Sequence, residues 1–160
     1  MSEAANPDLV RTSSLGDELT KQECEKLAAI MGVRHLDDGE LLSPEGGKDS
    51  TLFVLVKGRL AVTSNIEGAD REVYVMTQGE CAGTRAFVDR SPRKASLLAE
   101  GKATVYTLEP DAFEALLDRE PRVVYKVMRA LFRITHANLM RMNLESRELA
   151  NYITKSHGRY

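Results

Sequence analysis

Apolar residues recur at helical spacing early in the chain, after a polar stretch without periodicity. Residues 1–14 are mostly polar and contain Pro7, so we expect a loose, flexible leader there. Thr20 and Glu23 then form a capping-box pattern, and one apolar face follows: Cys24, Leu27, Ile30 and Met31. The pattern predicts a helix that begins at Thr20 and ends at Gly32, with Cys24 as a buried structural thiol.

Between residues 33 and 108 the pattern changes to short β runs separated by turns that contain glycine. The runs are Val33–Leu36, Glu40–Leu42, Leu52–Val56, Arg59–Ser64, Glu72–Thr77, Lys94–Ala99 and Thr104–Leu108. Many short strands at near-regular spacing predict a mainly β fold, an antiparallel double-stranded β-helix (jelly-roll) barrel with flanking helices. The Lys57-Gly58 pair between two of the runs predicts a tight hairpin.

Helical spacing returns after residue 108. The stretch Glu109–Leu117 predicts a short helix with Phe113, Leu116 and Leu117 on one side. Pro121 then opens a much longer helical pattern over residues 121–150, since proline is favoured in the first turn of a helix.

Two adjacent apolar stripes run along this long helix. The first contains Val124, Val127, Leu131, Ile134 and Asn138, and the second contains Met128, Phe132, Thr135, Leu139 and Met142. One stripe can pack on the barrel while the other meets a second copy, and we assign the first to a parallel helix-pair homodimer. The expected organisation is a leader (1–14), a β-barrel domain (15–120), a dimer helix (121–150) and a polar tail (151–160).

Charge and composition exclude several classes of protein. The formal net charge of −2 over 160 residues provides no general attraction to nucleic acid or to anionic membranes. No apolar run reaches the length of a membrane span, and the N-terminus lacks the apolar segment of a signal peptide. Two cysteines are too few for a disulfide framework, so we expect a cytoplasmic protein.

The residues that catalysis or metal binding needs are not grouped. His35, His136 and His157 lie far apart, without metal-binding spacing. No serine or cysteine stands in a nucleophile elbow, and there is no P-loop. We therefore expect a non-enzymatic protein without catalytic residues, metal or cofactor. The basic residues of the long helix have no interleaved aromatic residues for stacking on bases, so we expect a solvated face there.

Residues 79–99, GECAGTRAFVDRSPRKASLLA, combine a glycine-framed turn with an arginine. Exposed backbone N–H groups in such a turn, with a guanidinium nearby, form a cradle for a phosphate. The stretch resembles the phosphate-binding cassette of the cyclic nucleotide-binding domain family, whose members include catabolite activator protein-like sensors. The matching positions are Gly79, Glu80, Gly83, Ala86, Pro92, Arg93, Ala95 and Ser96.

The resemblance implies roles for particular residues. Arg93 would pair with the phosphate, and the alternative is a surface salt bridge with Asp89 or Glu100. The other implied ligand-binding residues are Gly83, Thr84, Arg85 and Ala86 through backbone N–H groups, Lys94, Ser96 through its hydroxyl, and Asn138 on the long helix. Candidate apolar walls around the base are Val73, Val75 and Leu97. Asn138 would either touch the base or fix the register of the dimer.

Thr84 departs from the family pattern, which has a ribose-binding glutamate at this position. Arg85 adds positive charge beside it. The two residues suit a ligand with more negative charge, a binder of modest affinity, or a pocket that has lost its ligand. The resemblance implies a sensor that binds cyclic AMP, cyclic GMP or a cyclic dinucleotide and signals through the long helix.

Two other functions stay open. One is a ligand-free dimeric module that docks onto a downstream protein partner. The other is a truncated transcription regulator, because about ten residues follow Ala150 and cannot supply a helix-turn-helix. We do not expect this chain to bind DNA directly.

Overall fold

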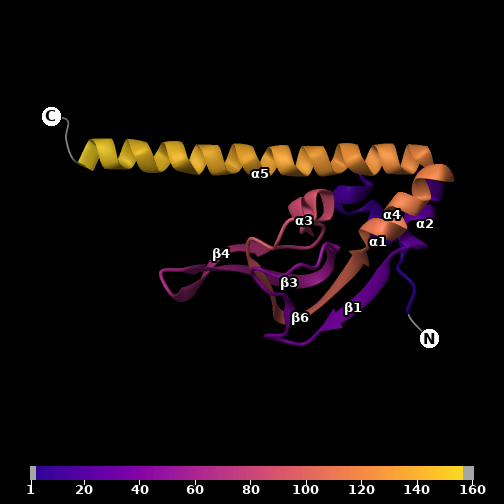
Figure 1. Cartoon of the computed structure of the whole chain (residues 1–160), viewed down its shortest axis with the longest axis horizontal. Helices are drawn as coiled ribbons and strands as arrows, with labels where there is room; N and C mark the ends of the chain where they lie inside the picture. The colour runs from indigo at the N-terminus through magenta and orange to yellow at the C-terminus, as the bar shows by residue number, and fades with distance from the viewer. Residues whose placement is uncertain (1–2, 157–160) are drawn as a thin grey trace.

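The computed structural model describes residues 3–156 of the chain. The elements in order are α1 (Pro7–Arg11), η1 (Ser14–Gly16), α2 (Lys21–Ala28), β1 (Gly32–Leu36), β2 (Leu41–Ser43), β3 (Leu52–Ile66), β4 (Ala69–Met76), β5 (Cys81–Ala82), α3 (Thr84–Asp89), β6 (Ser96–Leu108), α4 (Pro110–Ala115), η2 (Leu116–Asp118) and α5 (Pro121–Ser156). All strand pairs are antiparallel, and the long helix α5 lies across the short helices and the sheet (Figure 1). The expected fold class, mainly β with flanking helices and a long C-terminal helix, is confirmed.

Two long strands, β3 and β6, form the centre of the sheet. They pair from Leu52↔Leu108 to Thr63↔Ser96, with register shifts around Lys57. The first half of β3 also pairs with β5 and the second half with β4, while β6 pairs with β1 and β2. The break that we predicted between Lys94–Ala99 and Thr104–Leu108 is therefore wrong, because one strand crosses it.

The predicted hairpin at Lys57-Gly58 is also wrong. Gly58 has φ +86°, and a Cβ there would lie 2.4 Å from the Lys102 carbonyl oxygen, so the glycine serves a bulge inside β3. The actual hairpin joins β3 to β4 at Ile66↔Ala69. Glu67 and Gly68 both have positive φ there, as a two-residue type I′ turn requires.

The N-terminal region is more ordered than the sequence indicates. Residues Pro7–Arg11 form α1, capped by Asn6, and Val10 is fully buried, so the prediction of a loose leader is wrong for this segment. The capping box of Thr20 and Glu23 at the start of α2 is confirmed. The helix ends at Ala28, however, and Gly32 begins β1, where its hydrogen faces the Thr107 hydroxyl.

Two apolar clusters form the core. One lies between the strands and contains Phe53, Leu55, Leu60, Leu97 and Val105. The other joins the N-terminal helices to α4 and the first half of α5; its fully buried members include Val10, Leu15, Leu27, Val123 and Val127. Phe113 and Leu116 join the second cluster as expected, but Leu117 is exposed because η2 tightens the last turn.

The first apolar stripe of α5 packs in the core and does not have the role that we predicted for it. Val127 and Leu131 are buried in the core of the same chain, and Val124 and Ile134 pack against it, so the prediction that this stripe forms a dimer interface is wrong. Residues Met128, Phe132, Leu139 and Met142 of the second stripe are exposed. The first stripe meets the core because α1, α2 and α4 cover that side of the helix.

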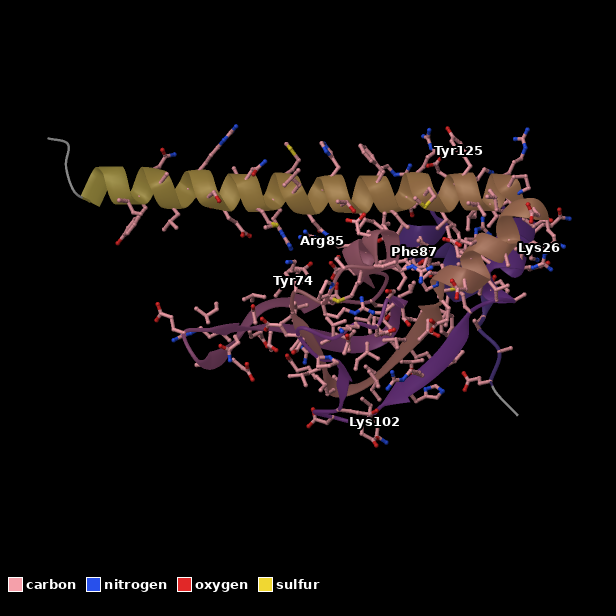
Figure 2. All side chains as sticks on the ribbon, in the orientation of Figure 1. Lys26, Tyr74, Arg85, Phe87, Lys102 and Tyr125 are labelled. Atoms are coloured by element: carbon pink, nitrogen blue, oxygen red, sulfur yellow. The ribbon has the colours of Figure 1, made fainter. Side chains whose placement is uncertain are left out.

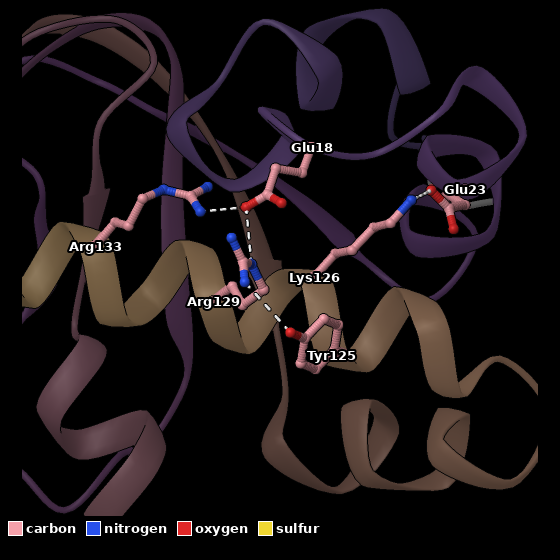
Figure 3. A network of polar contacts seen from close by, with 6 residues as sticks. All are labelled: Glu18, Glu23, Tyr125, Lys126, Arg129 and Arg133. Carbon is pink, nitrogen blue, oxygen red and sulfur yellow. Dashed lines mark hydrogen bonds and ion pairs between the residues drawn. The ribbon is translucent and has the colours of Figure 1, made fainter.

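Ion pairs attach the first half of α5 to the N-terminal helices (Figure 3). Glu18 accepts hydrogen bonds from Arg129 and Arg133, and Glu23 accepts one from Lys126 at 2.7 Å. The Arg133 hydrogen bond lowers the pKa of Glu18, although partial desolvation opposes this shift. These contacts fix the direction in which α5 leaves the core.

Candidate functional site

A cleft of about 880 Å³ lies between the second half of α5 and the sheet. Its walls come from β4, β5, α3, the loop before β6, and residues 135–145 of α5. Figure 2 shows Tyr74 and Arg85 between the sheet side and α5, with Lys102 on the far side of the sheet. The cleft therefore brings the predicted phosphate-binding stretch and the long helix to one place.

Arg93 is the buried charge of this cleft. Its side chain is only 4% exposed, and its Nη2 donates to Asp49 Oδ2 at 2.9 Å and to the Thr51 carbonyl at 2.6 Å. The guanidinium also lies 5.2 Å from the centroid of the Phe53 ring. Nε and Nη1 are buried without a hydrogen-bond partner in the described chain. The alternative of a surface salt bridge to Asp89 or Glu100 is therefore wrong.

Asp49 holds Arg93 in this orientation. Its carboxylate accepts hydrogen bonds from the Thr51 amide and hydroxyl as well as from Arg93. Burial raises the pKa of Asp49, but the hydrogen bonds from Thr51 and Arg93 outweigh burial and bring the pKa below its usual value. The carboxylate is thus charged at neutral pH and fixes one edge of the guanidinium.

Gly83 allows the guanidinium to approach the start of α3. It has φ +87°, and a Cβ on it would lie 2.4 Å from Arg93 Nη1 and 2.9 Å from the Thr51 carbonyl oxygen. Glycine adopts this left-handed backbone at no steric cost. A glycine is therefore required at position 83 both for its backbone conformation and for the close approach of the Arg93 guanidinium.

The α5 side of the cleft contains an interaction that the sequence does not reveal. The Arg141 guanidinium lies 4.4 Å from the centroid of the Tyr74 ring. The Tyr74 hydroxyl donates to Glu80 Oε1 at 2.5 Å, and this hydrogen bond raises the pKa of Tyr74. Glu80 Oε2 also accepts from the Thr77 amide, so the carboxylate of the glycine-framed turn holds the tyrosine. Neither Tyr74 nor Arg141 stands in a motif that could have marked it.

Most of the predicted ligand-binding residues lie in the cleft. Its lining includes Gly83, Thr84, Arg85, Ala86, Arg93, Lys94 and Asn138, together with the apolar residues Val73 and Leu97. Ser96 and Val75 are not part of this lining. The Ser96 hydroxyl instead accepts a hydrogen bond from the Glu45 amide at 2.8 Å, because β6 turns that side chain toward the Glu45 loop.

The two free cysteines of the described chain both have thiols with a raised pKa. Cys81 lines the cleft, but burial raises the pKa of its thiol to about 12, so it is not a thiolate nucleophile at neutral pH. Cys24 is buried, as predicted, and burial raises the pKa of its thiol as well.

Residues 3–156 contain no group of three or more metal-ligating side chains. None of the described helices is long and apolar enough to cross a membrane.

The chain is similar in sequence to parts of larger regulated kinases. The profile described as the cyclic nucleotide-binding domain matches residues 33–120. Human cGMP-dependent protein kinase 2 is 30% identical over 115 residues, which cover 71% of this chain and 14% of the kinase. The cGMP-dependent protein kinase egl-4 of Caenorhabditis briggsae is 31% identical over 107 residues, or 65% of this chain and 14% of that protein. The chain thus spans a small part of the length of these relatives.

Solved structures share the fold, among them the following two. A cyclic nucleotide-binding domain from Methylobacillus flagellatus superposes with a TM-score of 0.80 at 19% identity, covering 88% of this chain and 84% of that one. The catabolite activator protein of Thermus thermophilus superposes with a TM-score of 0.71 at 21% identity, covering 84% of this chain and 63% of that one. At these identities the likeness concerns the arrangement of the sheet, the flanking helices and the long helix.

Proposed function

Because the chain belongs to the cyclic nucleotide-binding domain family, we propose that it binds a cyclic nucleotide or a related phosphate ligand in the cleft and signals through α5. The observation that carries this proposal is the buried Arg93, whose Nε and Nη1 have no partner in the described chain. A buried donor without an acceptor costs free energy, more so when it is charged. A ligand phosphate supplies the missing acceptors in the bidentate geometry that a guanidinium prefers.

Signalling through α5 follows from its share in the cleft. Thr135, Asn138 and Arg141 line the same cleft as Arg93 and Gly83. A ligand that touches both walls binds most tightly to one position of the helix and therefore shifts the population toward that position. The first half of α5 is packed in the core and paired with Glu18 and Glu23, so we expect the movement to be in the second half.

We further propose that the exposed stripe of α5 pairs with a second copy of the chain. Its members follow a heptad repeat over residues 125–153: Tyr125, Met128, Phe132, Thr135, Leu139, Met142, Ser146, Leu149 and Ile153. Of these, Thr135, Leu139 and Met142 also line the cleft. After residue 135, the positions that flank this seam are His136, Asn138, Asn143, Glu145, Ala150 and Tyr152. Two identical helices in parallel register would therefore bring few like charges together.

The ligand site is tested by thermal shift and calorimetry with cyclic AMP and cyclic GMP. Wild-type protein is expected to melt at higher temperature as the concentration of one of them rises. Arg93→Gln and Arg93→Lys are expected to remove this shift, whereas Arg119→Gln, an exposed arginine outside the cleft, keeps it. Two Arg93 variants are needed because glutamine also leaves Asp49 without its partner. A flat response of the wild type would favour the ligand-free docking module.

The dimer is tested by light scattering. The double variant Met128→Glu, Phe132→Glu places charge at exposed seam positions outside the cleft and is expected to be a folded monomer. Met140→Glu, Leu144→Glu is the matched control, because both side chains are more than half exposed and lie off the seam. A wild-type monomer, or a double variant that stays dimeric, would refute this assignment.

A further inference from the structure

The loop of residues 46–51, between β2 and β3, holds Arg93 from two sides. On the backbone side, the Gly46 amide donates to the Arg93 carbonyl at 2.8 Å, and the Arg93 amide donates to the Gly47 carbonyl at 2.9 Å. On the side-chain side, Nη2 of the guanidinium donates to two oxygen atoms near the end of the same loop. The conformation of this loop therefore decides where the guanidinium lies.

Thr51 connects the loop both to the guanidinium and to α4. It is only 4% exposed, its carbonyl oxygen accepts from Arg93 Nη2 at 2.6 Å, and its amide donates to Asp49 Oδ1 at 3.1 Å. Its hydroxyl oxygen lies 2.6 Å from Asp49 Oδ1 and 2.9 Å from Glu109 Oε1. Because the hydroxyl has one hydrogen, the two carboxylate oxygens share it in a three-centre hydrogen bond.

Glu109 reaches this hydroxyl from the start of α4. It is the N-cap residue of that helix, yet its side chain makes no capping hydrogen bond. Its carboxylate is directed instead to Thr51, which lies 58 residues away in the chain, and the strand pair Leu52↔Leu108 keeps the two residues side by side. The Glu109 side chain therefore supports the loop and not its own helix.

We propose, on the basis of the proposed function, that Thr51 is a positioning residue for the phosphate-binding guanidinium and that Glu109 fixes its hydroxyl from α4. Thr51 does not line the cleft, so it acts on a ligand only through Arg93. The Thr51 amide and hydroxyl hold Asp49, so Nη2 has both of its acceptors in place before a ligand arrives. A binding group that is fixed in advance loses less freedom on binding, and this strengthens the affinity.

The hydroxyl matters because Asp49 is open to solvent. The Asp49 side chain is 47% exposed, so water competes for its oxygens, whereas the Arg93 side chain is 4% exposed and cannot follow it into solvent. Thr51→Val removes the hydroxyl but keeps the branched side chain and the hydrogen bonds of the backbone. Thr51→Ser keeps the hydroxyl and removes only the methyl group. The two variants therefore separate the hydroxyl from the packing.

The test observes Arg93 by NMR of the arginine Nε–H groups in the ligand-free protein and measures affinity by calorimetry with cyclic AMP and cyclic GMP. The Arg93 resonance is the one that Arg93→Lys lacks. Thr51→Val is expected to shift or broaden this resonance and to weaken binding about tenfold, while Thr51→Ser keeps both close to the wild type. Glu109→Ala should act in the same direction as Thr51→Val, whereas Glu109→Gln keeps an acceptor oxygen and should resemble the wild type.

Ser13→Ala is the control for the loss of a buried hydroxyl. Ser13 is 1% exposed, its hydroxyl donates to the Val10 carbonyl at 2.6 Å, and it does not line the cleft. The variant is expected to lose stability in urea denaturation while the Arg93 resonance and the affinity stay unchanged.

Each other outcome overturns a stated part of the inference. If Thr51→Val loses only stability, as Ser13→Ala does, Thr51 is structural and does not position Arg93. If Thr51→Ser behaves like Thr51→Val, the hydroxyl is not the positioning group. If Glu109→Ala matches the wild type, the support from α4 is refuted. If the wild type binds neither nucleotide while the Arg93 resonance depends on the Thr51 hydroxyl, the proposed function is wrong although the positioning of Arg93 stands.

Discussion

Gly83 offers a sharp test of how closely Arg93 packs on the start of α3. Substitution by alanine places a Cβ 2.4 Å from Arg93 Nη1 and 2.9 Å from the Thr51 carbonyl oxygen, at a residue with φ +87°. The left-handed backbone alone costs a non-glycine residue about 1 kcal/mol or more. Arg93 is buried and cannot move aside without weakening its hydrogen bonds to Asp49 and Thr51. Loss of one such charged hydrogen bond adds about 2 kcal/mol.

Gly39 supplies the matched control for this substitution. It has φ +80°, but a Cβ on it would meet nothing within 4 Å, so Gly39→Ala carries the backbone strain without the contact. We expect Gly83→Ala to lose about 3 kcal/mol of unfolding free energy and Gly39→Ala about 1 kcal/mol. For a chain of this size each kcal/mol lowers the melting temperature by about 2–4 °C.

Urea denaturation of both variants measures the difference between their unfolding free energies. An unchanged dependence of this free energy on urea concentration shows that the folded and unfolded states are comparable. Equal losses in the two variants would refute the close contact between Gly83 and Arg93. A larger loss at Gly83, together with a weaker response to phosphate ligands, is the expected outcome.

Three further predictions concern the core, the charge and the pocket. Leu131→Ala should destabilise the protein by about 2–5 kcal/mol in urea denaturation, whereas Leu144→Ala, at a side chain that is 56% exposed and lies outside the seam and the cleft, should cost far less; similar costs would contradict the packing of α5. The pKa of Asp49 is lowered in the folded state, so its charge adds stability above its usual pKa near 3.8, and this stability is lost as the pH falls through the lower folded pKa. The wild type should accordingly exceed Asp49→Asn in stability at pH 7, and melting curves should converge in strong acid; a constant gap would contradict this. Thr84→Glu adds a carboxylate that can accept from a ribose hydroxyl, so calorimetry should show cyclic AMP binding about tenfold tighter, and no gain would mean that the pocket differs at more positions.

The sequence alone was sufficient to predict the structural features that depend on residues close together in the chain. The capping box of Thr20 and Glu23, the strand composition and the first-turn proline of α5 are local features, and each formed where its residues predict. The phosphate-binding stretch was also recognisable, because Gly83 and Arg93 lie close in the chain and their chemistry is specific. These signals therefore identified the fold class and one wall of the cleft.

Only the tertiary structure decided what depends on distant segments. A glycine with positive φ suits a hairpin and a bulge equally, so Gly58 became a bulge only because β6 pairs with both halves of β3. Both stripes of α5 are apolar, and the packing of α1, α2 and α4 determined which one is buried. The contacts of Arg93 with Asp49 and of Arg141 with Tyr74 join residues far apart in the chain. No local pattern encodes such pairs, because burial and charge pairing arise only when the whole chain has folded.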